Sequence, residues 1–182
     1  MTKIGLISDT HGFLDEAIFT HFKDCDEIWH AGDFGIANFT PINITEKERS
    51  MSVWNENYFS NILGHKIIFR GVYGNIDDAN CRNNFPEKLF FTCEEVNVFI
   101  QHIGGYPGRY SKGIKENIIS NKCNLFISGH SHILKIMYDE KLDCLHINPG
   151  AAGKQGWHKK RTIVTLVITG SKMKDCKIIE LD

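Results

Sequence analysis

The sequence predicts an α/β fold in which two β-sheets are layered together with helices. In the first part of the chain, short apolar segments alternate with segments of helical periodicity, which is typical of a sheet built from β and α units. In the last part, four apolar segments follow one another with no helical segment between them. We therefore expect these later strands to form the second sheet.

The strands expected in the first part are five or six residues long and rich in Ile, Val, Phe and Leu without clean alternation. Such segments are typical of strands that are covered on both faces. They span residues 3–8, 27–31, 66–70, 96–101 and 124–128. The four later strands span residues 134–138, 142–147, 162–168 and 174–181.

Helices are expected between the early strands. Leu14, Ile18 and Phe22 recur every four residues and would lie on one helix face. A weaker helix is expected over residues 111–121.

The longest expected helix starts at a capping box and ends at a glycine. Thr45 and Glu48 form the capping box, and Gly64 is the stop signal. Its apolar face would consist of Met51, Trp54, Tyr58 and Ile62.

Composition restricts the class of protein. A chain of 182 residues fits one domain, residues 1–182, and the 42% of hydrophobic residues with 24% of charged residues excludes a disordered chain. The net charge of −1 disfavours a long nucleic acid as partner, and no apolar run approaches the roughly 20 residues of a membrane helix. Asp9 comes too early for a signal peptide. We expect a cytoplasmic protein whose six cysteines are reduced.

Polar residues directly follow five of the expected strands. The motifs are Asp9-Thr10-His11, Gly32-Asp33, Gly74-Asn75, His102 and Gly129-His130-Ser131-His132. Open α/β sheets bind ligands at the carboxyl ends of their strands, so we expect these side chains to converge. Each motif alone is a weak signal, but all of them together in this order are specific.

The converging side chains are two carboxylates, one amide and four imidazoles. They are too many for one ion, but they suit two divalent ions about 3.5–4 Å apart that share a carboxylate. Oxygen and nitrogen donors without thiolate favour Mn, with Fe, Zn and Ni as the other candidates. Such a pair of ions suits the hydrolysis of a phosphate ester.

The order of these motifs resembles the calcineurin-like metallophosphoesterase superfamily. The short chain, Gly74-Asn75-Ile76-Asp77 and Asn148-Pro149-Gly150 are most similar to the small YfcE-type phosphodiesterases. The resemblance implies a four-layer α/β/β/α sandwich of two mixed sheets, a small phosphoester substrate and two metal ions. It also suggests a homodimer, although the sequence leaves the oligomeric state open.

The resemblance assigns roles to single residues. It implies that Asp9, His11, Asp33 and His132 bind one metal ion. Asp33 would bridge to a second ion that is completed by Asn75, His102 and His130. A hydroxide between the ions would attack phosphorus in line, which makes Asp33 and Asn75 the catalytic residues. Asn75 would also contact the phosphate.

One departure from the family pattern bears on the substrate. Many members carry a histidine after the motif asparagine that assists the leaving group, whereas this chain has Ile76. Without that acid a poor leaving group is harder to expel, so we expect phosphodiesters rather than monoesters. Asp77 is expected to cap a turn rather than to replace the missing acid.

Several alternatives stay open at this stage. Arg109 could bind a second phosphate or belong to a solvated loop, and residues 153–161 could form a surface hairpin or attract phosphate. His158 has no place in the motif pattern. The rival hypothesis is a protein-binding scaffold of the same fold, like the retromer subunit, in which catalysis is weak or absent.

Overall fold

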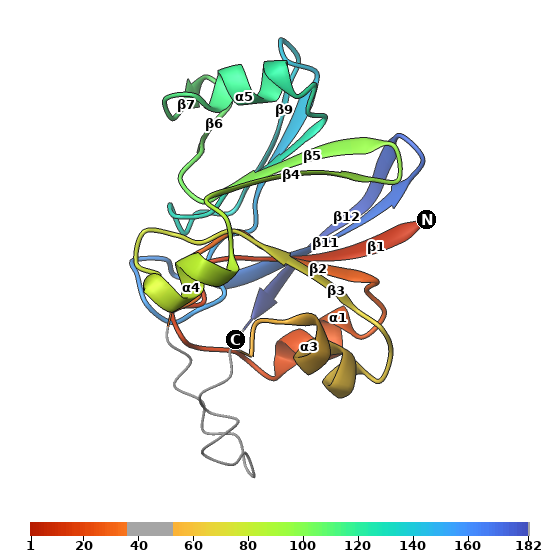
Figure 1. Ribbon diagram of the computed structural model, residues 1–182, viewed down its shortest axis with the longest axis vertical. Coiled ribbons are helices and arrows are strands. Elements are labelled where there is room, and N and C mark those ends of the chain that lie inside the picture. Colours follow the sequence, from red (N-terminus) through yellow and green to blue (C-terminus); the bar gives the residue numbers. More distant parts are fainter. Residues whose placement is uncertain (36–52, 182) are drawn as a thin grey trace.

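The computed structural model describes residues 1–35 and 53–181. Two five-stranded sheets face each other (Figure 1), and a short hairpin lies beside the second sheet. The first sheet has the order β12-β11-β1-β2-β3, with β1 (Thr2–Ile7), β2 (Glu27–His30), β3 (Ile68–Gly71), β11 (Arg161–Thr169) and β12 (Lys172–Leu181). The second has the order β4-β5-β8-β10-β9, with β4 (Lys88–Cys93), β5 (Val96–Gln101), β8 (Leu125–Ile127), β9 (Lys135–Asp139) and β10 (Cys144–Asn148). The hairpin consists of β6 (Gly105–Tyr106) and β7 (Arg109–Tyr110).

Each sheet is mixed. β1, β2 and β3 are parallel, and β11 and β12 extend the first sheet in antiparallel fashion. In the second sheet β5, β8 and β10 are parallel, while the outer strands β4 and β9 are antiparallel to their neighbours. The carboxyl ends of the parallel strands in each sheet therefore lie at one edge, where a ligand site is expected.

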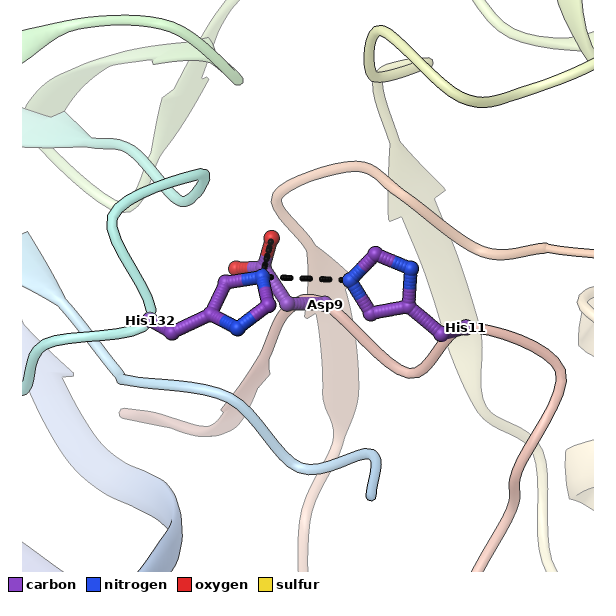
Figure 2. A group of neighbouring side chains, drawn as sticks. All are labelled: Asp9, His11 and His132. Carbon is purple, nitrogen blue, oxygen red and sulfur yellow. Dashed lines mark hydrogen bonds and ion pairs between the residues drawn. The ribbon is translucent and has the colours of Figure 1, made fainter. Parts of the chain in front are cut away.

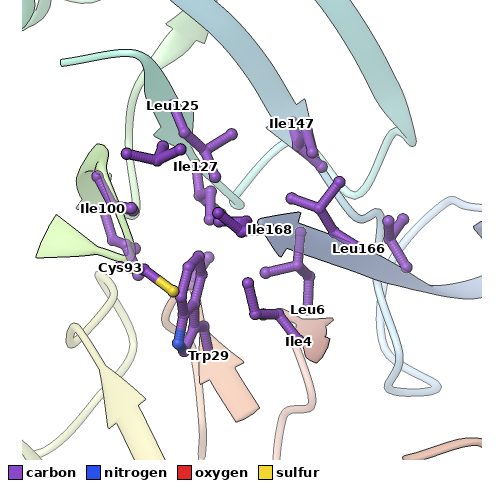
Figure 3. Close-up of a cluster of buried hydrophobic side chains, with 14 of the residues drawn as sticks. Ile4, Leu6, Trp29, Cys93, Ile100, Leu125, Ile127, Ile147, Leu166 and Ile168 are labelled. Atoms are coloured by element: carbon purple, nitrogen blue, oxygen red, sulfur yellow. The ribbon is translucent and has the colours of Figure 1, made fainter. Parts of the chain in front are cut away.

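The main core lies between the two sheets. Ile4 and Leu6 of β1 and Trp29 of β2 pack there against Ile100 and Leu125 of the second sheet (Figure 3). All five side chains are fully buried. Alternate residues of β1 point the other way, so Ile7 belongs to the core on the outer face of the first sheet.

Helices cover the outer face of each sheet (Figure 1). The described helices are α1 (Ala17–Phe22), α3 (Glu56–Leu63), α4 (Ala79–Asn84) and α5 (Ile114–Ser120). α1 and α3 bury Phe22 and Phe59 against the first sheet, and α5 buries Ile114 and Ile118 against the second. The layers therefore run α/β/β/α, as the resemblance implied.

The later strands do not all form the second sheet, contrary to the prediction. β9 and β10 join the second sheet, whereas β11 pairs with β1 and β12 extends the first sheet. β11 is buried over nearly its whole length. An apolar strand of this kind needs neighbours on both sides, and its sequence does not say which sheet supplies them.

The helix boundaries differ in detail from the predictions. α1 begins at Ala17, so Leu14 precedes the helix. α3 begins at Glu56 because the Asn55 side chain accepts a hydrogen bond from the Tyr58 N–H, so Trp54 also lies outside the helix. The predicted end at Gly64 is confirmed by its left-handed backbone, with φ 76°.

The remaining structural predictions concern the capping box, the cysteines and a membrane-spanning helix. The capping box of Thr45 and Glu48, together with Met51, lies outside the described residues. All six cysteines lie within the described residues, and none of them is paired in a disulfide; their reduced state in the cell stays a prediction. Among the described helices, none is both long enough and apolar enough to cross a bilayer.

Candidate metal centre

The strand ends bring the seven predicted side chains to one place. Six of them form two groups of three, and within each group the potential ligand atoms all lie within 4.8 Å of one another. The seventh, Asn75, contacts His102 of the second group. The first group is Asp9, His11 and His132. The second group is Asp33, His102 and His130. The expected convergence is confirmed for every one of these residues.

The first group is held together by a buried carboxylate (Figure 2). His132 Nε2 lies 3.3 Å from Asp9 Oδ1 and 3.1 Å from His11 Nε2. Asp9 itself is anchored, because Oδ2 accepts a 2.7 Å hydrogen bond from the Ser8 hydroxyl and the His130 N–H reaches both oxygens at 3.1 Å. The carboxylate therefore presents Oδ1 to the imidazoles in a fixed position.

The second group is organised by His102. Its Nδ1 lies 2.7 Å from the Ala31 carbonyl oxygen, which can only accept, so Nδ1 carries the proton. In the neutral ring Nε2 then has a lone pair, and this nitrogen lies 3.2 Å from Asp33 Oδ2 and 3.1 Å from Asn75 Oδ1. An electron pair that faces two oxygens is the arrangement expected around a cation.

The two groups adjoin each other through their carboxylates. Asp33 Oδ2 lies 4.0 Å from His11 Nε2 of the first group, and Asp9 Oδ1 lies 4.0 Å from His102 Nε2 of the second. Asp33 Oδ1 is held from the other side by the Ile76 N–H at 3.1 Å. Asp33 thus faces both groups, as a carboxylate shared by two ions must.

The backbone is strained where these side chains emerge. Five of the seven residues adopt positive φ angles: Asp9 54°, His11 48°, Asp33 56°, His130 68° and His132 57°. A left-handed conformation costs a side-chain-bearing residue about 1–2 kcal/mol. Strain of this kind concentrates at functional sites, because sharp turns aim nearby side chains at one point.

The electrostatics of the site favour positive charge at its centre. Burial lowers the pKa of His102, but in the protonated ring Nε2 would donate to Asp33, and this hydrogen bond, the charges of Asp9 and Asp33 and the Ala31 carbonyl together outweigh burial, so this pKa lies above its usual value. Burial raises the pKa of Asp33, but the hydrogen bond with His102, the charge of His102, the Ile76 N–H and the charge of His11 together outweigh it and hold this pKa below the usual value. His11 and His132 also point their Nε2 atoms at each other, which requires a cation or a proton between them. The residues present therefore fit a divalent metal with mixed oxygen and nitrogen ligands.

Two neighbouring residues support the loops that carry the ligands. His30 Nδ1 accepts the Gly32 N–H at 3.1 Å, just before Asp33. Both carboxylate oxygens of Asp77 accept backbone N–H groups, from Gly35 at 2.9 Å and from Gly74 at 2.7 Å. The predicted turn-capping role of Asp77 is thus confirmed.

His146 lies in β10, where it contacts the Ser128 hydroxyl.

A cavity of about 300 Å³ opens beside Asn75 and His102. Arg82 of α4, which the sequence analysis missed, lines this cavity and donates to the backbone carbonyls of Asn75 and Asp77. α4 is short and polar, so no apolar periodicity marked it. Arg109 has an exposed side chain on β7 and is not among the residues that line the cavity.

Residues 153–160 do not form the predicted hairpin. They form a loop that packs against the metal-ligand candidates, with the Gly153 N–H donating to the Asp9 carbonyl at 3.0 Å. Two of its three lysines contact other parts of the protein, since Lys154 lies over the Phe13 ring and Lys160 pairs with Glu180.

A family model described as the calcineurin-like phosphoesterase superfamily domain matches residues 2–171. The chain belongs to this superfamily. A curated relative, the "Probable metallophosphoesterase" of Methanothermobacter thermautotrophicus, is 28% identical over 153 residues, which is 81% of this chain and 76% of that protein.

Two solved structures show the same fold as this chain. The structure of a novel archaeal phosphodiesterase matches with a TM-score of 0.67 at 24% identity, over 98% of this chain and 99% of that chain. The structure of Vps29 from Entamoeba histolytica in complex with Zn²⁺ has a TM-score of 0.64 at 13% identity and covers 98% of both chains. At these identities the likeness establishes the two-sheet sandwich, and the metallophosphoesterase assignment depends on the family match and the ligand geometry.

Proposed function

We propose that this protein hydrolyses phosphodiester bonds of a small or medium substrate with two divalent metal ions, Mn²⁺ being the favoured metal. The observation that carries the proposal is the pair of adjoining ligand groups that both face Asp33. Two ions so held activate a water molecule and neutralise the charge of a phosphoryl group. The family match and the fold support the same assignment.

The residues around the site would hold the two ions and bind the substrate. Asp33 faces both groups, and Asp9 is fixed by backbone and hydroxyl donors. Asn75 directs Oδ1 at His102, which leaves its amide N–H groups free to donate to a phosphate oxygen at the cavity. Arg82 adds a positive charge to the wall of the same cavity. Arg109 would reach a substrate only if that substrate extends to the β6–β7 hairpin.

The residue after Asn75 supports a diester preference. Ile76 is 49% exposed and carries no proton donor at the position where many family members have a histidine. Asp77 is committed to two backbone N–H groups and is buried, so it is poorly placed to protonate a leaving group. Neither residue therefore supplies a positioned acid, which is worth about 10²–10⁴-fold for poor leaving groups, and an ester with a good leaving group is favoured.

The test compares an activated diester, bis(4-nitrophenyl) phosphate, with 4-nitrophenyl phosphate on metal-stripped protein refilled with Mn²⁺. We expect turnover of the diester that depends on added metal and exceeds that of the monoester by at least about tenfold. A faster monoester would contradict the interpretation of Ile76. Bound metal without turnover of either substrate would contradict the proposed activity.

A protein-binding scaffold is the second candidate, and one observation favours it. Three exposed isoleucines directly follow site residues: Ile76 at 49%, Ile103 at 42% and Ile133 at 60%. Apolar side chains exposed together around a site can dock a partner. A scaffold predicts tight, stoichiometric binding of a protein that blocks the cavity, together with the absence of hydrolysis in the experiment above.

A further inference from the structure

The loop of residues 153–160 lies against His132 of the first ligand group. Gly156 approaches the ring so closely that a Cβ atom there would lie 2.2 Å from His132 Nδ1. The same Cβ would lie 3.1 Å from His158 Nδ1. The Nδ1 atoms of the two histidines therefore border one small space beside Gly156.

The hydrogen bonding of His158 determines which of its nitrogens carries the proton. Its Nε2 lies 3.0 Å from the Gly153 carbonyl oxygen, which only accepts, so Nε2 is the donor. In the neutral ring Nδ1 then has a lone pair, and this atom is buried with no hydrogen-bond partner. A buried acceptor without a partner destabilises the folded state, so a neighbouring donor for His158 Nδ1 would stabilise it.

His132 supplies a donor of the required kind. The hydrogen bond and ion pair described for His132 both use Nε2, toward His11 and Asp9. When Nε2 of a neutral imidazole faces a metal ion, Nδ1 carries the ring proton and usually donates it to a neighbouring acceptor. The two rings already pack edge to face, with centroids 5.3 Å apart and an interplanar angle of 69°.

We propose that His158 is a positioning residue that holds the His132 ring, with its Nδ1 accepting the Nδ1–H of His132. This contact would fix the tautomer of His132 and keep Nε2 aimed at the first ligand group. The inference rests on the metal-binding part of the proposed function, and it does not depend on which ester is hydrolysed.

The test is a metal titration rather than an activity assay. Metal-stripped wild type, His158→Ala and His158→Asn are titrated with Mn²⁺ by calorimetry and with Co²⁺ by visible absorption. His21→Ala is the control, because it removes an exposed histidine outside the ligand groups. We expect His158→Ala to weaken one of two binding steps by about 10–100-fold and to change the Co²⁺ spectrum. His158→Asn, whose Oδ1 can accept in place of Nδ1, should recover most of the affinity.

The outcomes separate this inference from the proposed function. Wild type that binds no metal would overturn the proposed function. Wild type with two bound ions and an unchanged His158→Ala would overturn only the role of His158. Equal weakening of both steps, or no recovery in His158→Asn, would assign the loss to loop packing and would also overturn it.

Discussion

The variant His102→Ala is expected to lower kcat/KM for an activated phosphodiester by about 10³-fold, equivalent to about 4 kcal/mol of transition-state stabilisation. His102 Nε2 joins Asp33 to Asn75 at 3.2 and 3.1 Å, so its removal takes away one ligand and the orientation of two others. The substitution also leaves the Ala31 carbonyl without its hydrogen-bond donor, which we expect to lower the free energy of unfolding by about 1–3 kcal/mol. Steady-state kinetics and a thermal melt measure the two effects.

The control for this variant is His21→Ala, which should leave both kinetics and melting unchanged. Far-UV circular dichroism distinguishes loss of the site from loss of the fold. A folded His102→Ala protein that keeps full activity would show that the second ligand group is not catalytic. Asn75→Ala is expected to act in the same direction, because Asn75 faces His102 and the cavity.

The variant Gly74→Ala is expected to damage the site through a single methyl group. A Cβ at this position would lie 2.0 Å from Asp33 Oδ1 and 2.4 Å from the Asp33 backbone nitrogen. Because one of these atoms is backbone, the clash cannot be relieved by rotating a side chain. We expect a loss of about 1–3 kcal/mol in the free energy of unfolding, typical of overpacking. Affinity for one metal ion should fall by at least about tenfold, because the carboxylate that faces both groups is displaced.

Gly64→Ala is the matched control. Gly64 has φ 76° at the end of α3, and a Cβ there would meet nothing within 4 Å. The Gly64→Ala substitution should lower the free energy of unfolding by about 1 kcal/mol through backbone conformation alone, with metal affinity unchanged. Denaturant unfolding and metal titration of the two variants separate the two mechanisms. Metal affinity in Gly74→Ala equal to that of wild type would contradict the position given to Asp33.

The ligand candidates could be predicted from the sequence because they sit at strand ends. β1, β2 and β5 are buried runs whose length and composition mark them as covered strands, so the residues after them had a defined place. Asp9, Asp33 and His102 were placed together on that basis alone.

Other features depend on long-range contacts that periodicity does not encode. Residues 162–168 have the apolar pattern of a buried strand in either sheet, and only their pairing with β1, far away in the sequence, places them in the first. The whole of α4 was missed because its residues lack an apolar face, and Arg82 was missed with it. His158 lies in an irregular loop, so its contact with His132 follows only from the folded chain.

The most direct test of the dinuclear centre is a crystal structure of the Mn²⁺-loaded protein with anomalous diffraction data. We expect two anomalous peaks per chain about 3.5–4 Å apart, one beside Asp9, His11 and His132 and one beside Asn75, His102 and His130. The Asp33 carboxylate should lie between them. A single peak, or two peaks away from these side chains, would contradict the account.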